Sequence, residues 1–157
     1  MRDRFIGKAR VTVLLALAAA SLGLTTSALA ARAHQAGGTY IKESASLHRT
    51  GKHGFTLYES GSANGTIKGG IMLELDVVAT NRVTAKVSVS PHGGSIHGSG
   101  SAAYHVHGAY AEFSGTLSIT GGSGSYKGAH GSGLKFAGKI ARSSDAVTVT
   151  LDGTLYK

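Results

Sequence analysis

Residues 71–90, IMLELDVVATNRVTAKVSVS, decide the fold class of this chain. On both sides of the central ATNR, apolar side chains recur at every second position, which is the period that puts neighbouring side chains on opposite faces of a β-strand. Residues 79–82 have the composition of a tight turn, so the two runs predict an antiparallel hairpin. On its polar face we expect Glu74 and Asp76 to lie near Lys86.

The same alternation continues to the C-terminus, interrupted by clusters of glycine and serine, and no helical period is found beyond the N-terminal segment. About eight such runs at short spacing predict an all-β domain over residues 38–157. We expect a single antiparallel β-barrel, with a β-sandwich as the alternative. Near the start of this domain, Phe55 and Leu57 are predicted to face inward.

The N-terminal segment has the order of a secretory signal peptide. Four cations among the first ten residues precede the apolar run VTVLLALAAASLGL, and small residues follow as two successive A-x-A patterns, at Ala28 and Ala30 and at Ala31 and Ala33. A helical signal peptide is therefore predicted over residues 1–30, with cleavage after Ala30 or Ala33. Because the apolar run is shorter than the roughly 20 residues of a spanning helix, we expect a secreted, extracellular protein without stable membrane insertion. Residues 31–37 would form a mobile lead-in.

Composition narrows the classes of partner. The chain has no cysteine, so neither disulfides nor a thiolate zinc site can stabilise it. Of the formal net charge of +8, +3 comes from residues 1–10, and the other charges are scattered along the chain. Nucleic-acid-binding proteins cluster their cations, so we expect no nucleic-acid partner. Weak attraction to an anionic cell surface stays open.

The densest glycine cluster is SITGGSGSYKGAHGSG, residues 118–133. Its spacing misses the dinucleotide-binding G-x-G-x-x-G by one residue, and the following LKFAGKI predicts a strand where that motif requires a helix. We therefore expect no phosphate site and no cofactor here. The glycines favour a bend between two strands instead, formed by Gly121, Gly122, Gly124, Gly128 and Gly131.

Histidines offer the one candidate metal site. His105 and His107 share a face of a predicted strand, and imidazole suits zinc or copper. A polar outer face is the favoured alternative, because H-x-H by itself is a weak signal. Catalytic residues stay unknown, since there is no G-x-S-x-G and no spacing selects a triad or a carboxylate pair.

Residues 119–131 resemble the GGTGxFxGAxG segment of dirigent-like and allene oxide cyclase-like β-barrel proteins, and look closest to small secreted bacterial members. The matching positions are Gly121, Gly122, Gly124, Tyr126, Gly128, Ala129 and Gly131, with Ser123 where threonine is usual. The resemblance implies an eight-stranded antiparallel barrel with this segment as a bend between two late strands. Relatives guide phenoxy-radical coupling or close a fatty-acid epoxide, but their catalytic carboxylates and arginines match no position here.

Together these features favour a secreted barrel without catalysis that binds a small apolar or aromatic ligand or interacts with a cell surface. The first alternative is a dirigent- or cyclase-like enzyme that steers a reactive intermediate in the barrel cavity. The second is metal binding through His105 and His107. The polarity and volume of the barrel interior discriminate between the first two hypotheses.

Overall fold

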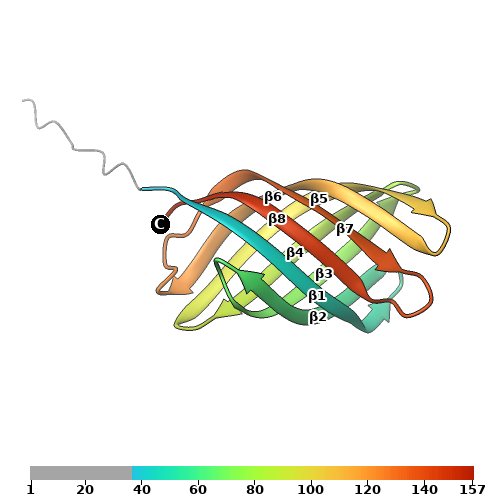
Figure 1. Cartoon of the computed structure of the whole chain (residues 1–157), viewed down its shortest axis with the longest axis horizontal. Helices are drawn as coiled ribbons and strands as arrows, with labels where there is room; N and C mark the ends of the chain where they lie inside the picture. Colours follow the sequence, from blue (N-terminus) through green and yellow to red (C-terminus); the bar gives the residue numbers. More distant parts are fainter. Residues whose placement is uncertain (1–36) are drawn as a thin grey trace, which may run out of the picture. The chain divides into compact units, whose positions relative to one another are not determined.

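The computed structural model describes residues 37–157, which form a closed antiparallel barrel of eight strands joined in sequence order (Figure 1). The strands are β1 (Thr39–His53), β2 (Thr56–Gly65), β3 (Gly69–Ala79), β4 (Arg82–Pro91), β5 (Gly94–His107), β6 (Tyr110–Gly124), β7 (Gly131–Ala141) and β8 (Val147–Leu155). The barrel prediction is confirmed, and the sandwich alternative is wrong. The expected signal peptide, its cleavage site and residues 31–36 of the lead-in lie outside the described residues.

The hairpin of β3 and β4 has the predicted register. Glu74 lies opposite Lys86, and the Lys86 Nζ is 2.8 Å from Glu74 Oε1 on the outer face. Asp76 accepts a hydrogen bond from the Thr56 hydroxyl of β2 instead.

Between residues 37 and 157 no helix is long and apolar enough to span a membrane.

Inward-facing side chains follow the sequence alternation closely, with one correction. Leu57 lines the interior as expected, but Phe55 does not and is 80% exposed. Phe55 lies in the turn between β1 and β2, because β2 begins only at Thr56. The alternation rule applies only within a strand, so it gives no direction for a residue just outside one.

The two ends of the barrel are built differently. We call the end with the β2–β3, β4–β5 and β6–β7 connections the closed end, and the end with the β1–β2, β3–β4, β5–β6 and β7–β8 connections the mouth. At the closed end, Ile67 of the β2–β3 connection and Ala129 of the β6–β7 connection belong to one buried cluster with Leu134. Leu134 is 0% exposed and Ala129 only 2%. This end is therefore filled by side chains from its own connections.

The glycine-rich segment connects β6 to β7 at the closed end. Gly121, Gly122 and Gly124 are the last glycines of β6, Gly128 lies in the turn, and Gly131 begins β7. Gly124 and Gly128 have φ angles of 57° and 83°, which only glycine adopts without strain. The turn carries Ala129 and the partly buried Tyr126 onto the core cluster. The bend thus places side chains that fill the end of the barrel.

Candidate ligand-binding cavity

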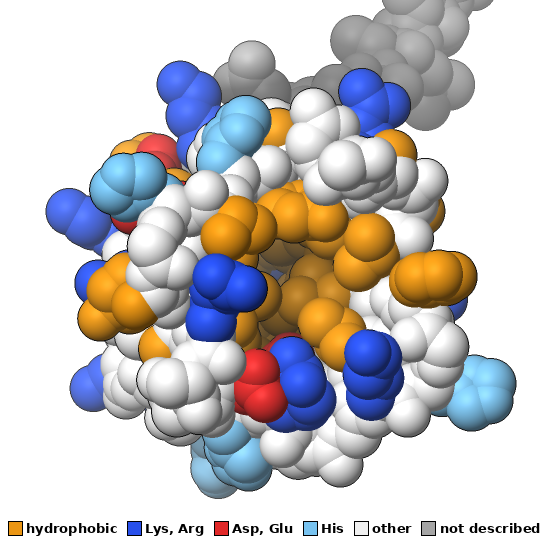
Figure 2. All heavy atoms as spheres, turned by 90° about the vertical axis from the view of Figure 1, so that its right-hand side faces the viewer, with side chains coloured by type: hydrophobic (Ala, Val, Ile, Leu, Met, Phe, Trp, Pro, Cys, Tyr) orange, Lys and Arg blue, Asp and Glu red, His pale blue; other side chains and the backbone are white. Residues whose placement is uncertain are grey.

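The middle of the barrel is hollow. A cavity of about 260 Å³ is lined by side chains from all eight strands, almost all of them Ile, Leu, Val, Ala or Phe. Figure 2 views the barrel from the mouth and shows an opening walled by hydrophobic side chains, with Lys, Arg and acidic side chains at its edge. Eight-stranded barrels have an interior that side chains either fill or leave just wide enough for one small ligand. This barrel is of the second kind.

Small residues at inward positions provide the space. Ala45, Ala63 and Ala85 line the cavity. Ala85 lies opposite Gly100 of β5, so two neighbouring positions contribute one methyl group between them. A larger side chain at Ala85 would therefore project into the cavity rather than into the barrel wall.

Glu43 is the one charged side chain in the cavity lining, and it is already engaged by the backbone. Its Oε1 accepts a hydrogen bond of 2.7 Å from the Ile67 N–H, which ties β1 to the β2–β3 connection. Its Oε2 is buried beside Gly65, where a Cβ would lie 2.6 Å from it, and has no hydrogen-bond partner in the described chain. Burial raises the pKa of Glu43, although backbone donors at Ile67 and Thr66 oppose this. The carboxyl therefore helps to hold the β2–β3 connection against β1.

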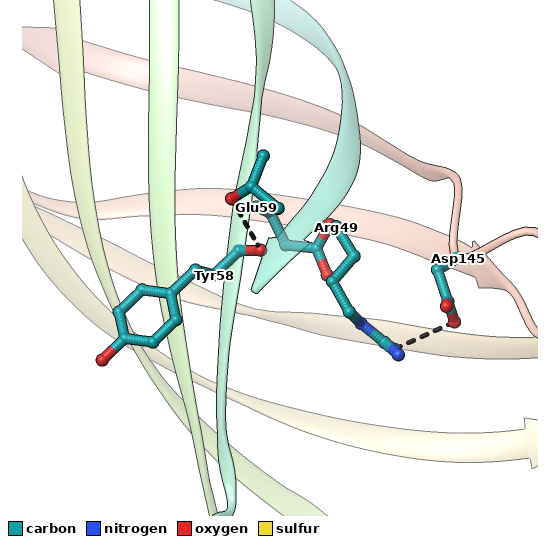
Figure 3. A network of polar contacts seen from close by, with 5 residues as sticks. Arg49, Tyr58, Glu59 and Asp145 are labelled. Carbon is teal, nitrogen blue, oxygen red and sulfur yellow. Dashed lines mark hydrogen bonds and ion pairs between the residues drawn. The ribbon is translucent and has the colours of Figure 1, made fainter. Parts of the chain in front are cut away.

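The carboxyl of Glu59 lies on β2 opposite Arg49 of β1 and, unlike the half-buried Glu43, is only 2% exposed. Arg49 has its Nε 3.9 Å from Glu59 Oε1. Its guanidinium NH2 group lies 2.9 Å from Asp145 Oδ1 in the β7–β8 connection (Figure 3). Burial raises the pKa of the Glu59 carboxyl, and the nearby Arg49 charge lowers it by a smaller amount. Arg49 thus links the inner wall to the edge of the mouth.

Sequence reasoning missed both glutamates and Arg49, although a signal for Glu59 was present. Glu59 stands at an inward position of the run that contains Leu57 and Ala63, both of which line the cavity. A carboxylate at such a position is uncommon, because burial of an unpaired charge is costly.

The lining of the interior is almost entirely apolar. Glu43 and Tyr104 are the only titratable side chains in the lining, and the lining contains no His, Ser, Lys or Arg. Glu43 is held by the β2–β3 connection, so no nucleophile–base pair faces the cavity. A ligand inside would meet hydrocarbon on almost every side.

The two histidines predicted to bind metal lie on the outer surface of the barrel and not in its cavity. His105 and His107 are exposed on β5, opposite Glu112 and Tyr110 of β6. Within residues 37–157, no three His, Cys, Asp or Glu side chains are grouped as a metal site would require. Metal binding stays a prediction, and the described geometry supplies no third ligand for it.

Comparisons with protein-family models, curated proteins and solved structures found no match. The resemblance of residues 119–131 to dirigent-like and cyclase-like barrels therefore stays a prediction from the sequence. The class that the fold defines is an eight-stranded antiparallel barrel with an apolar interior.

Proposed function

We propose that this barrel binds one small, largely apolar molecule in its cavity, without catalysis. The observation that carries the proposal is the apolar cavity of about 260 Å³. Transfer of hydrocarbon from water into such a site gains about 25 cal/mol per Å² of apolar surface removed from water. An interior that already exists needs little rearrangement to accept a ligand.

The lining also supports a preference among ligands. Because Glu43 Oε1 accepts from the Ile67 N–H and Glu43 Oε2 is buried beside Gly65, a polar group on the buried part of a ligand would find few accessible partners. We therefore expect hydrocarbon-like ligands to bind better than their hydroxylated analogues. The expected export signal supports a role for this binding outside the cytoplasm.

A fluorescence titration tests the proposal with the chain from residue 34, since all eight strands of the closed barrel lie within residues 37–157. The probe is N-phenyl-1-naphthylamine, whose emission rises in apolar surroundings. We expect saturable binding with one site per barrel. Ala85→Leu, which fills the space beside Gly100, is expected to weaken binding at least tenfold.

Ser101→Leu is the matched control, because it adds the same side chain at an exposed position of the neighbouring strand. It should leave the affinity within about twofold of the unchanged protein. Absence of saturable binding, or equal affinities for the unchanged protein and Ala85→Leu, would overturn the proposal. Circular dichroism melting of each variant separates loss of the site from loss of the fold.

A further inference from the structure

The mouth gathers exposed apolar side chains. Of the four exposed large side chains without a hydroxyl, three (Phe55, Val78 and Val106) lie at or next to mouth connections, and the fourth, Met72, lies on the outer wall in β3. The three lie beside three different connections, β1–β2, β3–β4 and β5–β6. Exposed apolar groups gathered on one face of a protein mark an interaction surface.

The exposed aromatic side chains near the closed end are of another kind. They are tyrosines with partners, since the Tyr40 hydroxyl donates to Asp152 at 3.2 Å and the Tyr156 ring stacks on His130 at 5.4 Å between centroids. Several apolar tips are therefore gathered only at the mouth, and Met72 is a single exposed apolar side chain elsewhere on the described wall.

Cations without carboxylate partners accompany the apolar tips. Lys52, Arg82 and Arg142 are exposed around the mouth, and in residues 37–157 none of them forms an ion pair. Of the nearby acids, Asp145 is paired with Arg49, and Asp76 accepts the Thr56 hydroxyl. Glu112 alone is exposed without an ion pair in residues 37–157, against three such cations around the mouth. The net unpaired charge of these residues is positive.

Apolar tips surrounded by cations match an anionic lipid surface. We propose that the mouth docks on such a bilayer, with Phe55, Val78 and Val106 at the boundary between headgroups and acyl chains and the cations on the headgroups. The cavity would then open directly onto the bilayer, so an apolar ligand could pass between them without crossing water. This last clause rests on the proposed function, whereas the docking itself does not.

A second copy of the chain fits this face less well. In a two-fold, mouth-to-mouth dimer the same surface meets itself, so Lys52, Arg82 and Arg142 of one copy would approach the same cations of the other. Like charges brought together at an interface disfavour association. An anionic surface neutralises them instead.

Co-sedimentation with sucrose-loaded vesicles tests the docking, again with residues 34–157 so that the expected signal segment cannot contribute. Vesicles of phosphatidylglycerol and phosphatidylcholine are compared with pure phosphatidylcholine. We expect binding to the first kind at moderate ionic strength and little to the second. Phe55→Ser should weaken binding severalfold, and the double variant Lys52→Glu/Arg82→Glu by at least about 25-fold, since each cation near the surface contributes roughly fivefold.

The matched control is Lys68→Glu/Lys127→Glu, which makes the same change in net charge at exposed positions of the closed end. If both double variants lose vesicle binding equally, the net charge of the protein explains the binding, and the proposal that the mouth is the docking face is wrong. Binding of the unchanged protein to neither vesicle, or self-association that Phe55→Ser abolishes, would likewise overturn the proposal.

The outcomes of the ligand experiment and the docking experiment are independent of each other. Ala85→Leu should still bind anionic vesicles, because its change lies inside the barrel. The mouth variants should still bind N-phenyl-1-naphthylamine in solution. Failure of probe binding would thus leave the vesicle result intact, and the reverse also holds.

Discussion

The closed end and the mouth of this barrel are made from the same eight strands, yet they differ in how they treat apolar side chains. At the closed end, Ile67 and Ala129 reach inward from the connections and pack on Leu134. At the mouth, Phe55 points into solvent, and the buried polar group is Glu59 beside Arg49. The strand pattern is alike at both ends, so it is the connections that close one end and leave the other open.

This difference separates the end that stabilises the barrel from the end that we propose to bind. Buried aliphatic contacts and close backbone packing stabilise the closed end, whereas the mouth carries exposed hydrocarbon, a buried carboxyl and charges. Regions that bind ligands or surfaces commonly give up some stability in this way. Three substitution pairs test this comparison.

The largest effect is expected from Leu134→Ala at the closed end. Leu134 is fully buried, so its truncation should lower the free energy of unfolding by about 2–5 kcal/mol. Phe55→Ala at the mouth removes more carbon atoms but leaves no cavity. It should change the free energy of unfolding by less than about 0.5 kcal/mol. Urea denaturation measures both, and comparable losses would mean that Phe55 packs on the barrel.

A smaller effect is expected in the glycine-rich bend. A Cβ at Gly122 would lie 2.7 Å from the Ser95 carbonyl oxygen of the neighbouring strand, whereas a Cβ at Gly121 would meet nothing within 4 Å. Gly122→Val should therefore cost about 1–3 kcal/mol by overpacking. Gly121→Ala should be nearly neutral. Thermal melting compares the two, and an unchanged melting temperature for Gly122→Val would contradict close packing here.

The smallest effect concerns Glu59 near the mouth and depends on pH. Because burial raises the pKa of Glu59 in the folded chain, the folded state binds this proton more tightly than the unfolded state does. The stability of the unchanged protein should then fall as pH rises from the ordinary glutamate pKa of about 4.3 through the raised value. Glu59→Gln does not titrate and leaves Arg49 paired with Asp145.

We therefore expect Glu59→Gln to gain stability relative to the unchanged protein as the pH rises above the ordinary glutamate pKa of about 4.3, as measured by urea denaturation at several pH values. Glu74→Gln is the control, since Glu74 lies on the outer wall and pairs with Lys86. Glu74→Gln should lower the free energy of unfolding only slightly, because exposed ion pairs contribute less than about 1 kcal/mol. If Glu59→Gln instead lost stability relative to the unchanged protein, and lost more as the pH rose, the attraction of Glu59 to Arg49 would outweigh the cost of its burial.

Most of the fold could be predicted, but only part of the cavity. The alternation in residues 71–90 predicts the inward set that includes Leu75 and Val77, and both line the interior. Phe55 was assigned wrongly because it lies one residue outside its strand. Glu59 and Arg49 were missed because their proximity depends on the register of β1 against β2, which shifts at a bulge between Arg49 and Gly51.

The sequence by itself determined that this chain forms strands and which side of most strands faces inward, whereas closure into a barrel rather than a sandwich was decided by the tertiary structure. The strands and their inward sides follow from the period-two pattern, which is a local consequence of backbone geometry. Only the tertiary structure decided that the interior is hollow, that Ala129 fills one end, and that the other end is an open mouth. Those properties depend on the summed volumes of side chains from all eight strands, and no local pattern contains that sum.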